Sequence, residues 1–273
     1  MTDIFVVGYP RSGTCWMTWL LSDILDSPIE KSDAPLAYED VGRIGPHRIR
    51  QMHAVPRHGK QSNLISGNIF LNVNHMGSNK LVHMIRDPRD VSVSHLYYYF
   101  ISNLMDVIVW MGGEGYEWGS GKPISQIFDE IHLDVKHEWI KQGWSTFVLS
   151  WELCSMEHSM VRYEDLLRDS KGQLTELMLE LGFDVREERI EQAIDRQAFD
   201  VKRKQIEEEL HLRLYGPSIQ LRNLRKGVAG DWKTHYHQCH AKLAQEIFGD
   251  MMLKLGYVED ERWWRQMDLP PKD

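Results

Sequence analysis

The chain has 273 residues, 42% of them hydrophobic, which is enough to bury a sizeable core, and we predict a single domain spanning residues 1–273. Its formal charge of −8 argues against a nucleic-acid partner, because a general nucleic-acid binder needs a basic face to neutralise backbone phosphates. No stretch reaches the roughly 18 apolar residues of a membrane span. The N-terminus does not read as a signal peptide, and the three cysteines lack metal-site spacing. We therefore expect a cytoplasmic protein with free thiols.

The first predicted unit, residues 4–25, is a strand, a glycine-bounded turn and a helix. Residues 4–7 read IFVV, a short apolar run typical of a strand buried on both faces of a parallel sheet. Thr14 is expected to cap a helix whose apolar residues recur at three- and four-residue spacing. Backbone N–H groups and the positive end of the helix dipole then converge on one point, so the expected ligand is an anion.

The turn has P-loop spacing, because four residues separate Gly8 from Gly13. Thr14 and Cys15 replace the Lys-Ser/Thr pair of an NTPase, and the cation lies inside the loop at Arg11. Residues 8–16, GYPRSGTCW, resemble the phosphosulfate loop of the cytosolic sulfotransferases, in which a lysine stands at the Arg11 position. Taken alone, such a turn is also compatible with a tight strand-to-helix connection.

Residues 27–78 are rich in Pro, Gly, His and Arg and show no long periodicity. We predict an extended loop region across one rim of the sheet, and a long insertion of this kind is commonly a substrate-binding feature. Each of its histidines is also compatible with an ordinary exposed loop position. They are His47, His53, His58 and His75.

A second buried strand is predicted at residues 80–85, followed directly by RDPRDVSVS at residues 86–94. Pro88 is tolerated near a helix start, and Arg86 and Ser94 lie eight residues apart, so both can face a ligand at the strand end. The segment resembles the sulfotransferase motif Arg-x-x-x-Asp-x-x-x-Ser, which implies that Arg86 and Ser94 hold the 3′-phosphate of the cofactor. By itself it is also compatible with a surface Arg-Asp network.

The remaining elements are assigned from apolar periodicity. We predict helices at residues 124–131, 147–151, 173–181, 186–196, 198–213 and 239–255, and a strand at residues 159–163. The aromatic residues of the second helix are expected in the core, and the Trp263 tail is expected to pack back on the domain. Charged residues of 202–209 predict a solvated face with i,i+4 pairs. Residues 107–113 either line a pocket for the molecule that would accept the sulfuryl group or pack in the hydrophobic core.

Two later segments extend the resemblance. Residues 163–166, YEDL, match a family motif, which implies that Tyr163 approaches the adenine, with Phe199 and Trp16 on either side of the base. Residues 225–233, RKGVAGDWK, match the family's Arg-Lys-Gly-x-x-Gly-Asp-Trp-Lys, which implies a 3′-phosphate clamp formed by Arg225, Lys226 and Gly227.

With four motifs in order, the chain is identified as a member of the sulfotransferases that use 3′-phosphoadenosine 5′-phosphosulfate (PAPS). The resemblance implies a P-loop-type three-layer α/β/α fold with a central parallel sheet and in-line sulfuryl transfer to a hydroxyl or amine of a small-molecule acceptor, for which natural-product tailoring is one compatible role. No metal is expected. The implied catalytic residues are Arg11, His53 and Ser94. The implied cofactor-binding residues are Arg11, Ser12, Gly13, Thr14, Cys15, Trp16, Arg86, Ser94, Tyr163, Phe199, Arg225, Lys226 and Gly227.

Several alternatives stay open at this point. A P-loop kinase would need a Lys-Ser/Thr pair and a magnesium-binding acid, neither of which is convincingly placed. A non-catalytic nucleotide-binding module would bind without turnover. The acceptor, the choice of O- or N-sulfation and the oligomeric state are undetermined. His53 follows a short extended segment and is the predicted base, with His58 as its rival.

Overall fold

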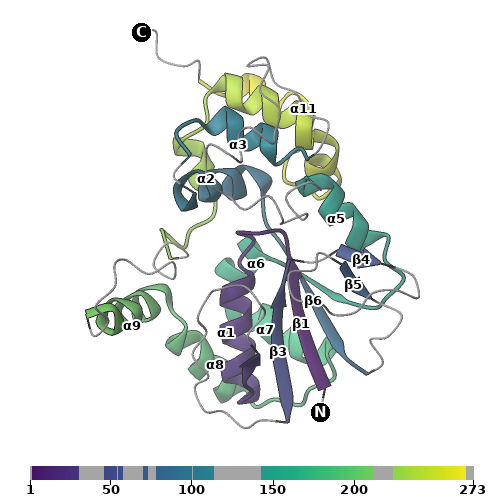
Figure 1. Cartoon of the computed structure of the whole chain (residues 1–273), viewed down its shortest axis with the longest axis vertical. Helices are drawn as coiled ribbons and strands as arrows, with labels where there is room; N and C mark the ends of the chain where they lie inside the picture. The colour runs from purple at the N-terminus through teal and green to yellow at the C-terminus, as the bar shows by residue number, and fades with distance from the viewer. Residues whose placement is uncertain are drawn as a thin grey trace. The chain divides into compact units, whose positions relative to one another are not determined.

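The computed structural model of the chain describes residues 2–30, 46–53, 55–57, 70–72, 78–99, 101–113, 143–211 and 224–268. The chain divides into two compact units (Figure 1). The first comprises Met1–Ile85 and Cys154–Val228, and the second comprises Arg86–Leu153 and Ala229–Asp273. The single-domain organisation stays a prediction.

The first unit contains a five-stranded sheet in the order β2-β3-β1-β6-β7. Every pairing in it is parallel, which confirms the predicted central parallel sheet. Both predicted N-terminal strands are at its centre, because β1 pairs with β6. The bounds are β1 Thr2–Gly8, β2 Ile29–Glu30, β3 His47–Met52, β6 Lys80–Ile85 and β7 Ser159–Arg162. Two further short strands, β4 Val55–Arg57 and β5 Phe70–Asn72, pair with each other in parallel.

The helices of the first unit follow the apolar periodicity of the sequence. Their bounds are α1 Thr14–Leu25, α6 Tyr163–Arg168, α7 Ser170–Glu180, α8 Glu187–Arg196 and α9 Phe199–His211. The predicted charged face of α9 is confirmed, since Arg203 pairs with Glu207 at 2.9 Å and Lys204 with Glu208 at 3.8 Å. Gly13, not Thr14, is the N-cap of α1, so the predicted capping residue is wrong by one position.

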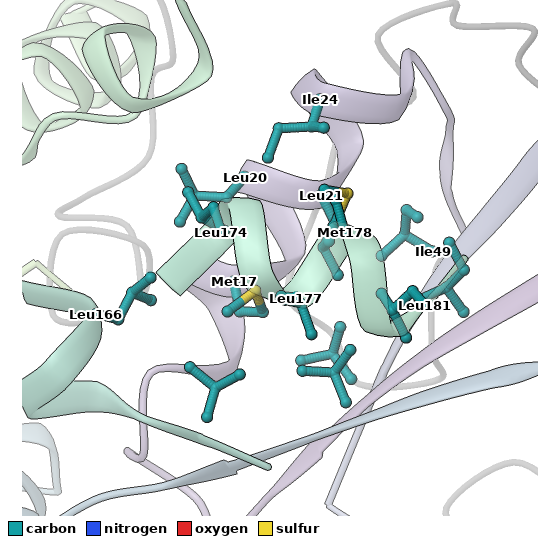
Figure 2. Packing of buried hydrophobic residues seen from close by; sticks show 14 of the residues in the cluster. Met17, Leu20, Leu21, Ile24, Ile49, Leu166, Leu174, Leu177, Met178 and Leu181 are labelled. Carbon is teal, nitrogen blue, oxygen red and sulfur yellow. The ribbon is translucent and has the colours of Figure 1, made fainter. Parts of the chain in front are cut away.

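One hydrophobic core joins α1 and α7 to the sheet (Figure 2). Met17, Leu20 and Leu21 of α1 face Leu174 and Leu177 of α7, and all five are buried. Fully burying one such side chain contributes roughly 1.5–3 kcal/mol. The alternate β1 residues Phe5 and Val7 are buried too, so both faces of the sheet are covered, as a three-layer fold requires.

The extended loop predicted for residues 27–78 is wrong where the structure describes it. β3 lies inside the sheet, next to β1. Its sequence did not indicate a buried strand, because charged residues such as Arg48 and Arg50 are typical of loops. In the fold, Asp3 of β1 neutralises both, with Nε–O distances of 2.7 Å to Arg48 and 3.2 Å to Arg50. A strand of this kind depends on a partner strand that is distant in the sequence.

The second unit is helical over its described residues. Its elements are α2 Pro88–Tyr98, α3 Leu104–Trp110, α5 Trp144–Glu152, α11 Gln238–Lys254 and the 3₁₀ turns η3 Asp231–Thr234 and η4 Trp263–Gln266. The α5 aromatics Phe147 and Trp151 are buried, as predicted for core residues. Val107 and Trp110 are buried within α3, which favours packing over a pocket wall for this stretch. The helix predicted at residues 124–131 lies outside the described residues.

Across the described ranges, the structure holds no helix that is both long and apolar enough to cross a membrane.

Candidate functional site

The turn between β1 and α1 has a backbone suited to binding an anion. The N–H of Ser12 donates to the carbonyl of Tyr9 at 3.1 Å, which closes the turn. Arg11 and Gly13 both adopt the left-handed region, with φ of 73° and 91°. Left-handed residues of this kind turn neighbouring N–H groups toward one side of a loop, where they form an anion-binding concavity at the start of a helix.

Two glycines allow the close packing that this turn requires. A Cβ added at Gly13 would lie 2.6 Å from Cδ2 of Tyr163, and one added at Gly8 would lie 2.8 Å from the carbonyl oxygen of Met84. Real Cβ atoms do not approach so closely, so each position needs glycine. The predicted glycine-bounded turn is therefore set by its neighbours on β6 and α6.

The hydroxyl groups of the turn differ in how they are satisfied. Thr14 Oγ1 accepts a hydrogen bond from Nε2 of Gln51 at 3.0 Å. Ser12 Oγ is buried, and within the described part of the chain it has no hydrogen-bond partner. A buried hydroxyl without a partner is costly, and an anion oxygen in the turn would satisfy it. The turn therefore fits the 5′-phosphate that the sequence resemblance implies.

An aromatic pair lies beside the turn. The rings of Trp16 and Tyr163 have centroids 5.9 Å apart and meet edge to face at 71°. Tyr163 also packs against Gly13, as described above. The structure thus brings together the two aromatic residues that the sequence assigned to the adenine from positions almost 150 residues apart. Cys15, next to Trp16, is partly buried and carries a free thiol.

Phe199, the third predicted adenine contact, packs directly on Gly227. A Cβ at Gly227 would lie 2.4 Å from Cδ2 of Phe199, and φ there is 64°. The structure therefore joins the start of α9 to the predicted 3′-phosphate segment. Within that segment, Arg225 is partly buried and Lys226 is exposed.

Two contacts tie the region around Phe199 to α1. The ammonium of Lys202 lies 4.6 Å from the ring centroid of Trp19, and the side-chain amide of Gln197 donates to the buried carboxylate of Asp23. Since α1 also carries Trp16, the same helix holds one predicted adenine contact and binds the two residues, Gln197 and Lys202, that flank Phe199 in the sequence.

His53 lies at the carboxyl end of β3, where its ring meets the turn. Val7 pairs with Met52, so His53 continues the register opposite Gly8, and its Nδ1 lies 2.8 Å from the Gly8 carbonyl oxygen. A carbonyl only accepts, so Nδ1 carries the proton and Nε2 carries the lone pair. Burial lowers the pKa of His53 to about 4; the hydrogen bond to Gly8 opposes the shift and the charge of Arg11 adds to it. The imidazole is therefore neutral at pH 7.

The other candidate histidines are separated from this position or lie outside the described residues. His47 opens β3 and pairs with Thr2, at the opposite end of the sheet from the turn. At about 3.3 Å per residue, the six positions between His47 and His53 correspond to about 20 Å. His58 and His75 lie outside the described residues.

Arg86 and Ser94 belong to the second unit: Arg86 lies two residues before α2 begins, and Ser94 lies within α2. Both are buried, with exposed fractions of 8% and 6%. α2 begins as predicted at Pro88, and Asp87 caps it by accepting the N–H of Arg89 at 2.9 Å. The same carboxylate forms an ion pair with the Arg89 guanidinium at 2.6 Å. An Arg-Asp pair thus exists at Asp87 and Arg89, next to Arg86, but it is buried and is not the surface network that the sequence left as an alternative.

Two residues with well-defined hydrogen bonds, one in each unit, were not singled out from the sequence. Gln51 lies two positions before His53, on the same face of β3, and the alternation of a strand would have indicated it if β3 had been predicted. Asp90 lies midway between Arg86 and Ser94 on α2. Its carboxylate accepts the N–H groups of Gly230 at 2.6 Å and Trp232 at 2.9 Å. The sequence shows that Asp90 lies four residues after Arg86, but it does not show that the carboxylate accepts hydrogen bonds from Gly230 and Trp232.

No group of three or more His, Cys, Asp or Glu side chains is arranged to hold a metal ion within the described residues. The independence of the reaction from metal stays a prediction.

The chain is similar to known proteins over most of its length. A family profile described as "Sulfotransferase domain" matches residues 1–256. Sulfotransferase 2A1 of Rattus norvegicus is 23% identical over 274 residues, covering 92% of this chain and 84% of the relative. The 3-alpha-hydroxysteroid sulfotransferase of Cavia porcellus is 24% identical over 277 residues, covering 97% and 88%.

Solved structures show the same fold. Mouse sulfotransferase SULT7A1, crystallised with PAP, superposes with a TM-score of 0.63 at 19% identity, covering 97% of this chain and 89% of that one. Retinol dehydratase in complex with androsterone and the inactive cofactor PAP gives a TM-score of 0.57 at 17% identity, covering 92% and 80%. At these identities the likeness shows a shared α/β fold.

Proposed function

The chain belongs to the sulfotransferase family, and from this premise we propose that it moves a sulfuryl group from PAPS to a hydroxyl or amine of a small-molecule acceptor by in-line transfer. The observation that carries the proposal is the turn at residues 8–13. Its left-handed residues, its two obligatory glycines and the buried hydroxyl of Ser12 form an anion site at a helix start, beside the aromatic pair of Trp16 and Tyr163.

Within this proposal, the first unit binds the nucleotide through backbone and aromatic groups. The N–H groups of Gly13 to Cys15, together with Ser12, bind the 5′-phosphate. Trp16, Tyr163 and Phe199 provide apolar faces for the adenine. The 3′-phosphate is assigned, as the sequence resemblance implies, to Arg86, Ser94, Arg225, Lys226 and Gly227, since guanidinium groups suit bidentate phosphate binding.

PAPS supplies an activated sulfuryl group, whose departure leaves negative charge on a bridging oxygen. Arg11 is the cation of the turn and stabilises charge that develops there, because a preorganised donor costs no reorganisation during the reaction. A guanidinium does not deprotonate near neutral pH, so Arg11 acts as a charge and hydrogen-bond donor and not as a general acid.

His53 is proposed to remove the acceptor proton. Its tautomer, fixed by the Gly8 carbonyl, places the basic lone pair on Nε2, and its low pKa keeps the ring neutral at working pH. An anion in the turn would offset the charge of Arg11, which is one of the causes that lower the pKa of His53. Nucleotide binding would therefore make His53 a stronger base.

The acceptor class is proposed from the relatives and from the chemistry of transfer. One relative is named for a 3-alpha-hydroxysteroid and one structural neighbour was crystallised with androsterone, so steroid alcohols open the acceptor screen, followed by phenols and amines. The free thiols of Cys15, Cys154 and Cys239 support a cytoplasmic location.

Calorimetry with 3′,5′-bisphosphoadenosine and AMP tests the proposal. Each charge-assisted hydrogen bond contributes about 1.5–3 kcal/mol, so losing even the contacts of Arg86, Ser94 and Arg225 to the 3′-phosphate should weaken binding at least about a hundredfold. Equal affinity for the two nucleotides would contradict the cofactor assignment. Labelled PAPS with the acceptor panel then tests transfer, and tight nucleotide binding without transfer to any acceptor would indicate a non-catalytic module.

A further inference from the structure

The strongest unassigned feature of the first unit is a glutamine on an apolar face of the central sheet. Gln51 follows Ile49 by two residues in β3, so the two side chains are on the same face of the strand. Ile49 belongs to the hydrophobic core that α1 forms with the sheet (Figure 2). Gln51 is buried too, with an exposed fraction of 6%. Burying an amide is costly unless it is hydrogen-bonded, so packing alone would favour an apolar residue at this position.

The amide of Gln51 meets the start of α1. Its Nε2 donates to the hydroxyl oxygen of Thr14 at 3.0 Å, and both residues are buried. The register of the sheet explains the approach, because Gln51 pairs with Val6, two residues before β1 ends at Gly8 and the turn begins. Both partners of this hydrogen bond belong to the first unit, although 37 residues separate them in the chain.

The direction of this hydrogen bond decides what the Thr14 hydroxyl can do. An amide N–H₂ group only donates, so the hydroxyl oxygen accepts in this contact. A hydroxyl also carries one proton, which it can then donate to a second partner. Thr14 opens α1 directly after the left-handed Gly13, beside Ser12, whose buried hydroxyl has no partner within the described part of the chain. An anion in the turn would supply an acceptor for both hydroxyl protons.

We propose that Gln51 is a positioning residue for the 5′-phosphate of the nucleotide, because it holds the Thr14 hydroxyl as an acceptor and so leaves the hydroxyl proton for a phosphate oxygen. The inference rests on the proposed function and adds to it a residue from outside the turn. A hydroxyl that donates to a phosphate makes a charge-assisted hydrogen bond. Without Gln51 the hydroxyl can rotate, only a fraction of molecules presents the proton to the phosphate, and the apparent affinity falls by that fraction.

The test compares 3′,5′-bisphosphoadenosine with adenosine 3′-phosphate, which lacks only the 5′-phosphate. Calorimetry measures both affinities for the parent chain and for Gln51→Met, which keeps a long unbranched side chain at the buried position and removes the amide. We expect the variant to bind the bisphosphate about tenfold more weakly and adenosine 3′-phosphate within about twofold of the parent. The ratio of the two affinities is the readout, since a general loss of stability would lower both. Gln51→Leu, which also lacks the donor, replaces Gln51→Met if that variant does not fold.

A double-mutant cycle separates positioning from direct contact. Thr14→Val removes the hydroxyl and should lower the affinity for the bisphosphate selectively, at least as much as Gln51→Met. In the Thr14→Val background, Gln51→Met should cause no further selective loss, because the group that it orients is gone. Thr18→Val is the matched control: it removes another buried hydroxyl of α1, one turn later, whose proton is already donated to the Thr14 carbonyl at 2.8 Å. It should leave the ratio of the two affinities unchanged.

Each outcome bears on a different step. A parent-like ratio in the folded Gln51 variant would overturn the inference and leave Gln51 as a buried stabilising contact. A selective loss that persists in full in the Thr14→Val background would also overturn it, because Gln51 would then act without the hydroxyl. The same holds for a selective loss shared by Thr18→Val. A parent chain that binds the two nucleotides equally would refute the assignment of the turn to the 5′-phosphate, on which the proposed function stands, and the inference would fall with it.

Discussion

Replacing His53 by alanine tests both its proposed chemistry and its unusual ionisation. General-base catalysis contributes about 10²–10⁴ in rate, so we expect His53→Ala to lower the turnover number by about 10² or more. The affinity for 3′,5′-bisphosphoadenosine should change little, because the nucleotide ligands assigned above do not include His53.

The pKa of His53 also predicts how much folding stability the chain loses in acid. An unfolded histidine titrates near 6.5 and the folded one near 4, so between these values the unfolded chain binds more protons than the folded chain. Stability is therefore lost as the pH falls from about 6.5 to about 4. At pH 5 the loss from this one group is about 2 kcal/mol, since each unit of pKa corresponds to about 1.4 kcal/mol.

The His53→Ala variant should be less stable than the parent at pH 8 and more stable than the parent at pH 5. At pH 8 it lacks the hydrogen bond to the Gly8 carbonyl and should be less stable by about 1 kcal/mol. At pH 5 it escapes the cost of the neutral imidazole and should be more stable than the parent by a similar amount. The two stability curves should cross near about pH 6.

Urea unfolding of both proteins at pH 8 and pH 5 measures this crossing. His83, which is fully buried, has its pKa lowered to about 3 by burial and by His158, and it also costs stability in acid. Because His83 is present in both proteins, its contribution cancels in the difference between them. Parallel loss of stability in the two proteins would show that His53 is not held neutral.

Kinetics decide the chemical role. A normal turnover number for His53→Ala, with a strongly reduced one for His58→Ala, would move the base to the rival histidine. If neither substitution matters, the general-base step is wrong, and an acceptor amine that is already neutral when bound becomes the better hypothesis.

Two further predictions concern the turn and the metal. Gly13→Ala places a Cβ 2.6 Å from Tyr163 in a left-handed residue and should weaken nucleotide binding, measured by calorimetry, at least about tenfold. Gly182→Ala is the control and should bind like the parent, because Gly182 is also left-handed, at φ 76°, but has no atom within 4 Å of the added Cβ. Equal effects in the two variants would show that the approach of Tyr163 is unimportant. Turnover with labelled PAPS should survive EDTA, because Arg11 and backbone amides are assigned to the charge of the donor; loss of activity that magnesium restores would instead favour a P-loop phosphotransferase.

The parts of the fold that the sequence predicted well are those whose signal is local. Residues 4–7 and 80–85 are apolar runs flanked by turn signals, and both are strands at the centre of the sheet. The helix after Gly13, the helix after Asp87 and the buried aromatics of α5 follow from apolar periodicity or capping residues within about ten positions. Such features require no knowledge of a distant partner.

The sequence predicted only a short extended segment before His53, and it did not predict that this segment is a strand of the central sheet, because the arginines of residues 47–52 are as compatible with a charged loop as with a strand. Its arginines are compatible with the sheet only when Asp3 lies alongside, 45 residues earlier in the chain. Because β3 was not recognised as part of the sheet, Gln51 was not singled out, and His53 was chosen as the base only from its place in the sequence. The structural support for His53 is its position opposite Gly8 and the contact of its Nδ1 with the Gly8 carbonyl oxygen.

By itself, the sequence determined the chemistry available to this protein: the glycine-bounded turn, the arginine within it, the order of the four motifs and hence the family. Only the tertiary structure decided how these residues are held. It placed Tyr163 against Gly13, aligned His53 with Gly8 and directed the Asp90 carboxylate to Gly230 and Trp232. The physical reason is that backbone conformation and apolar periodicity are encoded within a few residues, whereas a buried hydrogen bond or a close glycine contact exists only after two distant segments have packed and excluded water.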